Sequence, residues 1–158
     1  MPLHPIVVHF PIAGAVFALP LVLGVLWAVR TGRLPRKTWL LPGALQLISL
    51  FGAFASLASG EDLEESAEDE HDESQIEAHE GHAQRLTAGI AVGTVATIAA
   101  AFVPAAVTIP VEVAAVVLGA AGAGLAVPTG HSGGEMVWGE ATPSDPAFPR
   151  YTDRGDDK

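Results

Sequence analysis

The fold of this chain is decided by residues 38–60, TWLLPGALQLISLFGAFASLASG, a stretch without Asp, Glu, Lys or Arg. A second stretch, residues 86–134, contains a single such residue, Glu112. A surface helix of a soluble protein carries charge on its solvent-facing side, whereas about 20 consecutive apolar residues are enough to cross a bilayer. Both stretches therefore predict helices that lie in lipid.

Hydropathy along the chain predicts four membrane-spanning helices, at about residues 5–29, 39–59, 85–103 and 110–127. Each has roughly 18–25 residues, which suits a hydrocarbon core about 30 Å thick. Pro104 and Pro128 are expected to close the third and fourth spans, since proline removes a helical hydrogen bond. We expect an all-α, integral membrane four-helix bundle with short loops over residues 1–138, an acidic segment between spans two and three, and a polar tail, 139–158, without regular structure.

The basic residues predict how the bundle is oriented. Four of the eight lie in one short loop, residues 30–37. Lys and Arg near span ends favour the cytoplasmic side, whereas Asp and Glu have little effect. The sequence therefore predicts a multi-pass membrane protein, with this loop inside and both termini outside. All six histidines, and the eleven of eighteen acidic residues found in 61–82, then lie on the outer side.

Composition excludes several classes of site. The net charge of −10 disfavours nucleic acid, because few cations are present to replace the counterions of phosphates. The absence of cysteine excludes thiolate metal sites, iron–sulfur clusters and covalent c-type haem attachment. No nucleophile elbow, phosphate-binding glycine loop or HExxH pattern occurs. The chain is therefore not expected to be an enzyme by itself.

The third and fourth spans carry residues that favour close packing. Gly89 and Gly93 form a GxxxG spacing, and Gly119 with Ala123 repeats it in the next span. Small residues let helix backbones approach closely in lipid, although alanine and glycine are also common throughout this chain. The two spans are expected to pair. Glu112, near the inner end of the fourth span, is expected to complement the positive end of the helix dipole.

Two histidines lie at the beginning of the first span. His9 is flanked by Val8 and Phe10 in the outer part of the hydrocarbon layer, where an ionisable residue is a functional-site hypothesis by default. Alternatively, a neutral His9 imidazole bonds a backbone carbonyl, for which the kink at Pro11 frees one nearby. His4 is expected either to cap the helix or to reach a ligand from the surface.

The segment before the third span carries further candidate ligands. His79 and His82 are three residues apart and share one face of a helix. This spacing suits one transition-metal ion with further ligands from elsewhere. Glu61 and Glu80 could add carboxylates. The alternative for residues 68–77 is a solvated acidic run whose like charges hold it open.

His131 lies among glycines, after Gly130 and before Ser132-Gly-Gly. A tight turn that requires positive φ would explain these glycines. A ligand held by such a turn would explain them equally well. His131 is therefore a candidate ligand as well.

The sequence around these residues resembles a bacterial family of predicted membrane proteins that is described as a domain of unknown function. The opening HPIVVHFP, residues 4–11, is similar to the family's HP-x-x-VHFP start. The likeness continues in Ser59-Gly-Glu61, in His79-Glu80 and in the GH-x-GG motif at residues 130–134, and it covers about residues 4–138. Trp138 stands where the family often has Tyr.

The resemblance implies a four-span bundle, and its bacterial family implies a multi-pass protein of a bacterial inner membrane with both termini extracytoplasmic. Some members of the family are joined to cytochrome c domains, which implies an electron-transfer setting. His71 and His82 do not clearly belong to the pattern. The positions that match it are His4, His9, Glu61, His79, Glu80 and His131.

Three functions remain open from the sequence. A b-type haem needs two axial histidines on different helices, which His9 with His79 or His131 could supply. A non-haem Zn, Fe or Cu site could use His4, His9, Glu61, His79, Glu80 and His131, since mixed imidazole and carboxylate ligands suit these ions. Either would serve the electron transfer that the resemblance implies, with redox membrane proteins or cytochrome c as partners and with the chain as a monomer or an oligomer. The alternative is a non-catalytic membrane subunit or scaffold in which the polar cluster is structural.

Overall fold

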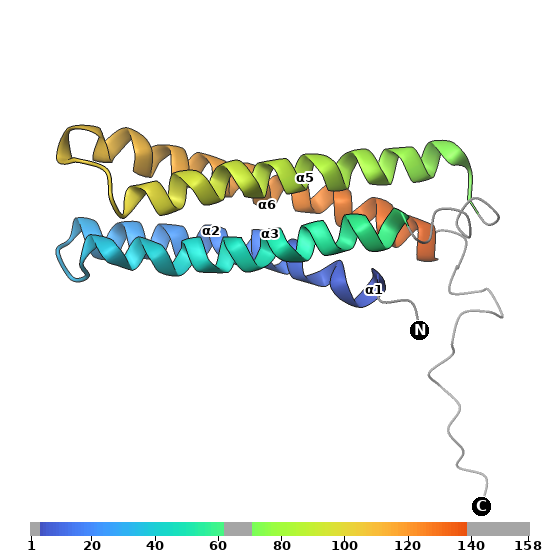
Figure 1. Cartoon of the computed structure of the whole chain (residues 1–158), viewed down its shortest axis with the longest axis horizontal. Helices are drawn as coiled ribbons and strands as arrows, with labels where there is room; N and C mark the ends of the chain where they lie inside the picture. Colours follow the sequence, from blue (N-terminus) through green and yellow to red (C-terminus); the bar gives the residue numbers. More distant parts are fainter. Residues whose placement is uncertain (1–3, 62–70, 139–158) are drawn as a thin grey trace, which may run out of the picture.

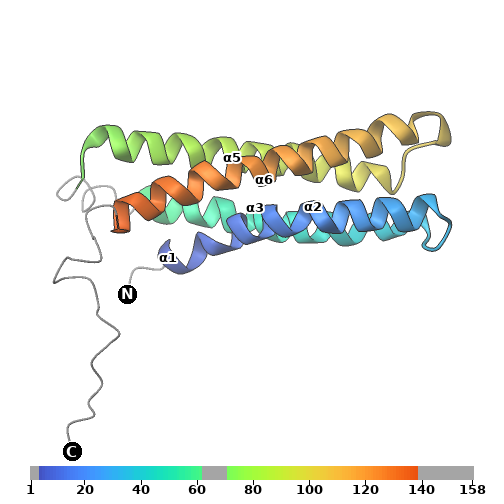
Figure 2. The ribbon, with the colours of Figure 1, turned by 180° about the vertical axis from the view of Figure 1, so that it is seen from behind.

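The computed structural model of the chain describes residues 4–61 and 71–138. Over these residues it is an all-helical bundle, which confirms the predicted fold class. Four long helices lie side by side, and successive helices run in opposite directions (Figures 1 and 2). They are α2 (His9–Arg30), α3 (Leu40–Glu61), α5 (Glu73–Ala100) and α6 (Thr108–Trp138), and a short helix, α1 (His4–Val7), precedes them.

The two ends of the bundle differ in composition. One end is formed by residues 4–8, 56–61, 71–82 and 129–138, and we call it the histidine end (Figure 1). The opposite end, which we call the loop end, carries the connections between α2 and α3 and between α5 and α6 (Figure 1). These connections contain the 3-10 turns η1 (Arg36–Trp39) and η2 (Ala105–Val107).

The first predicted span is helical but interrupted. α1 ends at Val7, and α2 begins at His9. Pro11 lacks the N–H that would bond the carbonyl of Val7, so the helical ladder breaks there. Pro20 lies inside α2 without ending it.

The connection from α2 to α3 is a compact, hydrogen-bonded turn at the loop end. The N–H of Gly32 bonds the carbonyl of Val29, and the N–H of Arg33 bonds that of Ala28. With Gly32 at φ 72°, these bonds form a Schellman motif, which ends a helix by satisfying its last carbonyls. The Arg36 guanidinium then donates to the carbonyls of Ala100 (3.0 Å) and Val103 (2.7 Å), so it ties the α2–α3 connection to the end of α5.

Two predicted boundaries are wrong, both at the histidine end. α5 begins at Glu73, so this part of the acidic segment is helical and does not stay open. α6 continues through Pro128 to Trp138, and the one glycine with positive φ in the described chain is Gly32, not a glycine beside His131. In both places packing between helices outweighs the local signal, because the last turns of α6 lie against α5 and α2.

Close packing of α5 on α6 is confirmed. A Cβ at Gly89 would lie 3.1 Å from the Leu125 side chain, and one at Gly93 would lie 3.7 Å from Leu118 Cβ. Gly119 instead faces α2, where Leu19 is its nearest neighbour. The small residues thus serve two helix contacts, since they let α6 approach both α5 and α2.

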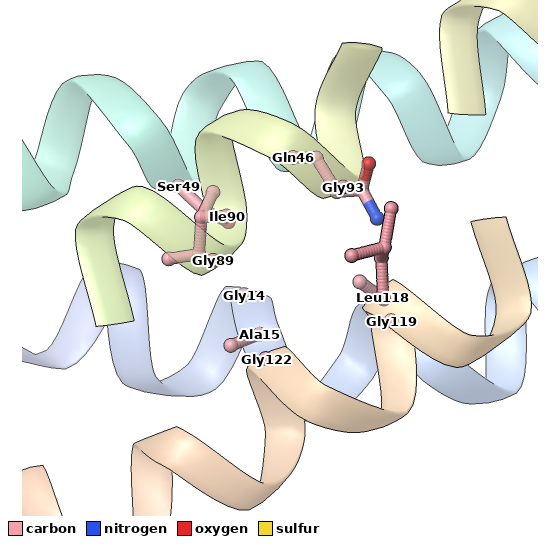
Figure 3. A pocket seen from close by; sticks show the side chains of 11 residues that line it. Gly14, Ala15, Gln46, Ser49, Gly89, Ile90, Gly93, Leu118, Gly119 and Gly122 are labelled. Atoms are coloured by element: carbon pink, nitrogen blue, oxygen red, sulfur yellow. The ribbon is translucent and has the colours of Figure 1, made fainter. Parts of the chain in front are cut away.

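Small side chains also fill the centre of the bundle. Gly14, Ser49, Gly89 and Gly122 lie around a cavity of about 10 Å³ between the four helices, and Gln46 of α3 points toward Gly93 and Leu118 (Figure 3). Buried apolar residues form a core on either side of this point. Toward the histidine end the core contains Ala15, Leu86, Ile90 and Ala126, and toward the loop end it contains Val22, Val25, Trp39, Ala100, Ala101 and Ala115.

The outward surface of the bundle is apolar. Phe17 of α2 is 65% exposed, Phe51 of α3 is 73% exposed, and Val95 of α5 is 70% exposed. Within the part of the chain that the structure describes, three helical segments are long and apolar enough to cross a membrane, namely His9–Arg30, Arg36–Glu61 and Ala105–Met136. The predicted third span, in α5, is not among them, since the first half of α5 carries Glu73, Glu77, Glu80 and Arg85.

Candidate functional site

Histidines from two separate segments lie at the histidine end. His4 lies on α1, whereas His79 and His82 lie on the second and third turns of α5. His4 and His82 are close enough to His79 for their charges to lower its pKa. We call these three residues the histidine cluster.

His4 is held by the last turns of α3. Its Nδ1 lies 2.9 Å from the hydroxyl of Ser59. That hydroxyl donates to the carbonyl of Ser56 at 3.1 Å. Gly60 makes room for the ring, because a Cβ there would lie 3.3 Å from His4 Cε1. The motif that ends α3 therefore positions His4.

His79 is held in the same way by α6. Its Nδ1 lies 2.9 Å from the hydroxyl of Ser132, which donates to the carbonyl of Thr129 at 3.2 Å. Gly133 lies directly against the ring, and a Cβ at that position would approach His79 Cε1 to 3.0 Å. Gly133 therefore allows α6 to lie close to the His79 imidazole and does not form a turn.

Each of these two serine hydroxyls lies between an imidazole nitrogen and a backbone carbonyl. A serine hydroxyl has one proton. When Ser59 and Ser132 donate theirs to the carbonyl, the imidazole is the donor in each pair and Nδ1 carries the proton, which is one of the two tautomers that these bonds allow. The Nε2 atoms of His4 and His79 then carry a lone pair, the state in which a histidine binds a metal.

Burial keeps these rings neutral. Loss of solvent lowers the pKa of His79 below its ordinary value, and the charges of His4 and His82 lower it further. Burial likewise lowers the pKa of His4, against a smaller opposing effect of the Ser56 backbone. The Nδ1 of His82 is buried without a hydrogen-bond partner.

Residues 1–145 match the family described as Predicted membrane protein (DUF2231). The chain belongs to this family. No curated protein and no solved structure matches it. Membership of the family, together with three helices able to span a bilayer, establishes a membrane protein.

Two of the other predicted ligands, His131 and Glu80, have partners on their own helices. His131 is 73% exposed and pairs with Glu135 on its own helix at 3.2 Å. Glu80 is exposed and accepts a hydrogen bond from Gln84 at 2.6 Å. Glu61 and His9 are also exposed. Within residues 4–61 and 71–138, no group of three or more His, Asp or Glu side chains is placed to hold a metal ion.

Sequence reasoning missed the serines. Ser59 and Ser132 stand inside the motifs that resemble the family, directly beside Gly60 and His131, so the motifs contained the signal. The contact needs two helices in register, which neighbouring residues in the sequence do not reveal. The spacing of His79 and His82 did indicate a shared face.

A second polar site lies at the loop end and was also missed. Glu112 is 1% exposed and pairs with Arg30 of α2, whose Nη2 lies 2.6 Å from Oε2. The Arg30 Nε donates to the same oxygen at 2.8 Å. Glu112 was expected to interact with the dipole of its own helix. Its principal partner in the structure is instead a cation on a neighbouring helix, because α2 and α6 are in contact there.

Proposed function

We propose that this membrane protein binds a transition-metal ion at the histidine end, with His4 and His79 as ligands and His82 beside them. The observation that carries the proposal is the pair of matching serine–imidazole bonds, which in the tautomer protonated at Nδ1 leaves Nε2 of His4 and of His79 as a lone-pair donor. Metal-binding histidines commonly have their second nitrogen held in this way.

The chemistry of the donors limits the choice of ion. Imidazole nitrogen suits Zn, Cu, Fe and Ni, whereas Mg and Ca prefer oxygen. The lowered pKa of both rings favours the neutral form that binds metal without competition from protons. Two imidazoles leave positions open for water or for a donor from a partner, which is compatible with the absence of a complete three-ligand group among the described residues.

The site is proposed to lie outside the cytoplasm. The loop end carries Arg30, Arg33, Arg36 and Lys37, and basic residues favour the inner side. α5 packs along α3 and α6 for much of its length and exposes Val92 and Val95. We therefore include it as a fourth span and place both termini outside an inner membrane. An exposed copper or iron ion there would suit an accessory role in electron transfer, as the cytochrome c fusions of related proteins imply.

Metal binding by detergent-purified protein tests the proposal. After incubation with Cu(II) or Zn(II) and desalting, the wild type is expected to retain about one ion per chain. Ser132→Ala removes the bond that fixes the His79 ring and is expected to weaken binding by about 10–100-fold. Ser74→Ala, an exposed serine on α5, is the control and should bind like the wild type. Retention of no metal by the wild type, or equal retention by Ser132→Ala, would contradict the proposal.

A structural role for the cluster is the second candidate, because the same bonds join helices. His4–Ser59 links α1 to α3, and His79–Ser132 links α5 to α6. A scaffold of this kind predicts that Ser132→Ala lowers thermal stability equally with and without metal, and that the protein co-purifies with a larger complex. The metal proposal predicts instead that added metal raises the stability of the wild type more than that of Ser132→Ala.

A further inference from the structure

A groove at the loop end opens between α2 and α6. It has a volume of about 300 Å³ and is lined by Leu26, Arg30, Glu112, Val113, Val116 and Val117. Val113 and Val117 are 55% and 59% exposed. Because both valines belong to a helix able to cross the membrane, the groove faces the acyl chains of the bilayer.

Glu112, which lines this groove, has an unsatisfied acceptor. Both bonds from Arg30 end on Oε2 of Glu112. The other oxygen, Oε1, is buried without a hydrogen-bond partner. A buried carboxylate oxygen without a donor costs free energy, so the groove is suited to a molecule that brings an N–H or O–H donor.

The Arg30 guanidinium also has N–H groups that do not bond Glu112. Arg30 uses Nε and Nη2 on Glu112, which leaves the N–H groups of Nη1 on a side chain that is 44% exposed. Guanidinium groups bind phosphate well. An occupant with both a phosphate and an ammonium group would therefore match both members of the pair.

We propose that the groove binds a phospholipid with a primary amine, of the phosphatidylethanolamine class, from the leaflet at the loop end. Its phosphate bonds Arg30, its ammonium group donates to Oε1 of Glu112, and one acyl chain covers the apolar wall formed by Leu26, Val113 and Val116. A choline phospholipid lacks the N–H donors that Oε1 requires. Phosphatidylglycerol offers Oε1 only neutral O–H donors, whose hydrogen bonds to a carboxylate lack the positive charge of an ammonium group.

Lipid binding to delipidated protein tests this inference, with native mass spectrometry used to count bound lipids. The probes are phosphatidylethanolamine, phosphatidylcholine and phosphatidylglycerol, each with the same acyl chains. We expect phosphatidylethanolamine to bind at least about tenfold more tightly than phosphatidylcholine, as one charge-assisted hydrogen bond allows. Equal binding of the three lipids, or preference for phosphatidylglycerol, would overturn the proposal.

Two variants distinguish lipid binding in the groove from lipid binding elsewhere on the surface. Val113→Phe narrows the groove without changing Arg30 or Glu112, and is expected to abolish the preference for the amine lipid. Val127→Phe adds the same side chain at an exposed position on α6 outside the groove, and should keep the preference. If both variants keep it, the lipid binds elsewhere and the inference fails. None of these outcomes depends on metal at the histidine end.

Discussion

At the scale of single residues, the half-buried imidazoles of His4 and His79 make the free energy of unfolding depend on pH. Burial lowers the pKa of His4 and His79 in the folded protein, whereas in the unfolded chain the pKa of each ring is about 6.5. Between the folded and the unfolded value, the unfolded state holds more protons, so stability rises with pH. The contribution of these rings to the free energy of unfolding is fully present above about pH 6.5. It is lost as the pH falls from that value toward the lower pKa of the folded state.

We therefore predict that the free energy of unfolding of metal-free protein falls on acidification from about pH 7.5 to 5.5. The free energy of unfolding of His79→Gln should decrease less over the same range, because this variant lacks one of the two imidazoles with a lowered pKa. His131→Gln is the control, since that imidazole is exposed and pairs within its own helix. Thermal unfolding in detergent at several pH values measures this. The same pH dependence in wild type and His79→Gln would show that the His79 ring does not contribute to the loss of stability on acidification.

The residues of the candidate site could be predicted only in part. The sequence indicated that His4 and His79 belong to one end of the bundle and that His79 and His82 share a face. It did not separate them from His131 and Glu80, whose side chains are exposed. On a helix, a difference of one residue turns a side chain by about 100°. Which face of α6 meets α5 is set by packing, and the packing puts Ser132 against His79 instead of His131.

At the scale of helices, close contact depends on glycines that have no room for a side chain. A Cβ at Gly14 of α2 would overlap the Ser49 side chain of α3. We predict that Gly14→Ala lowers the free energy of unfolding by about 1–3 kcal/mol, as overpacking of a core does. Gly24 lies on the same helix with nothing within 4 Å of a Cβ, so Gly24→Ala should be neutral or stabilise by up to about 1 kcal/mol.

Denaturant titration of the two glycine variants in one detergent measures this difference. Similar midpoints for Gly14→Ala and Gly24→Ala would mean that α2 and α3 do not approach at Ser49 as described. Because each variant adds the same methyl group to α2, the comparison removes the effect of helix propensity.

Helix boundaries show the limit of local signals. The type of every long helix could be predicted, because charge-free stretches of about 20 residues have few alternatives. The ends of α5 and α6 at the histidine end could not. The acidic residues before the third span, and Pro128 with the glycines after it, predict interruption, yet both segments are helical. These two helix ends stabilise each other, because Gly133 of α6 lies against His79 of α5. The two residues are far apart in sequence, so local signals do not reveal their contact.

At the scale of the whole molecule, the account requires the two ends to lie on opposite sides of the membrane. The chain contains no cysteine, so single-cysteine variants report on one position each. We predict that Glu135→Cys in spheroplasts reacts with a membrane-impermeant maleimide added from outside. Lys37→Cys, at the loop end, should react only after the membrane is opened. The reverse pattern, or reaction of both in intact cells, would contradict the orientation.

The central claim is that His4 and His79 present nitrogen donors to one metal ion. Electron paramagnetic resonance of Cu(II) added at one equivalent to the purified protein tests it most directly, because imidazole ligands split the copper signal. We predict nitrogen coupling from at least two imidazoles in the wild type and in His131→Ala, and its loss or reduction to one nitrogen in His79→Ala. An unchanged spectrum in His79→Ala, or a spectrum that changes only in His131→Ala, would contradict the claim.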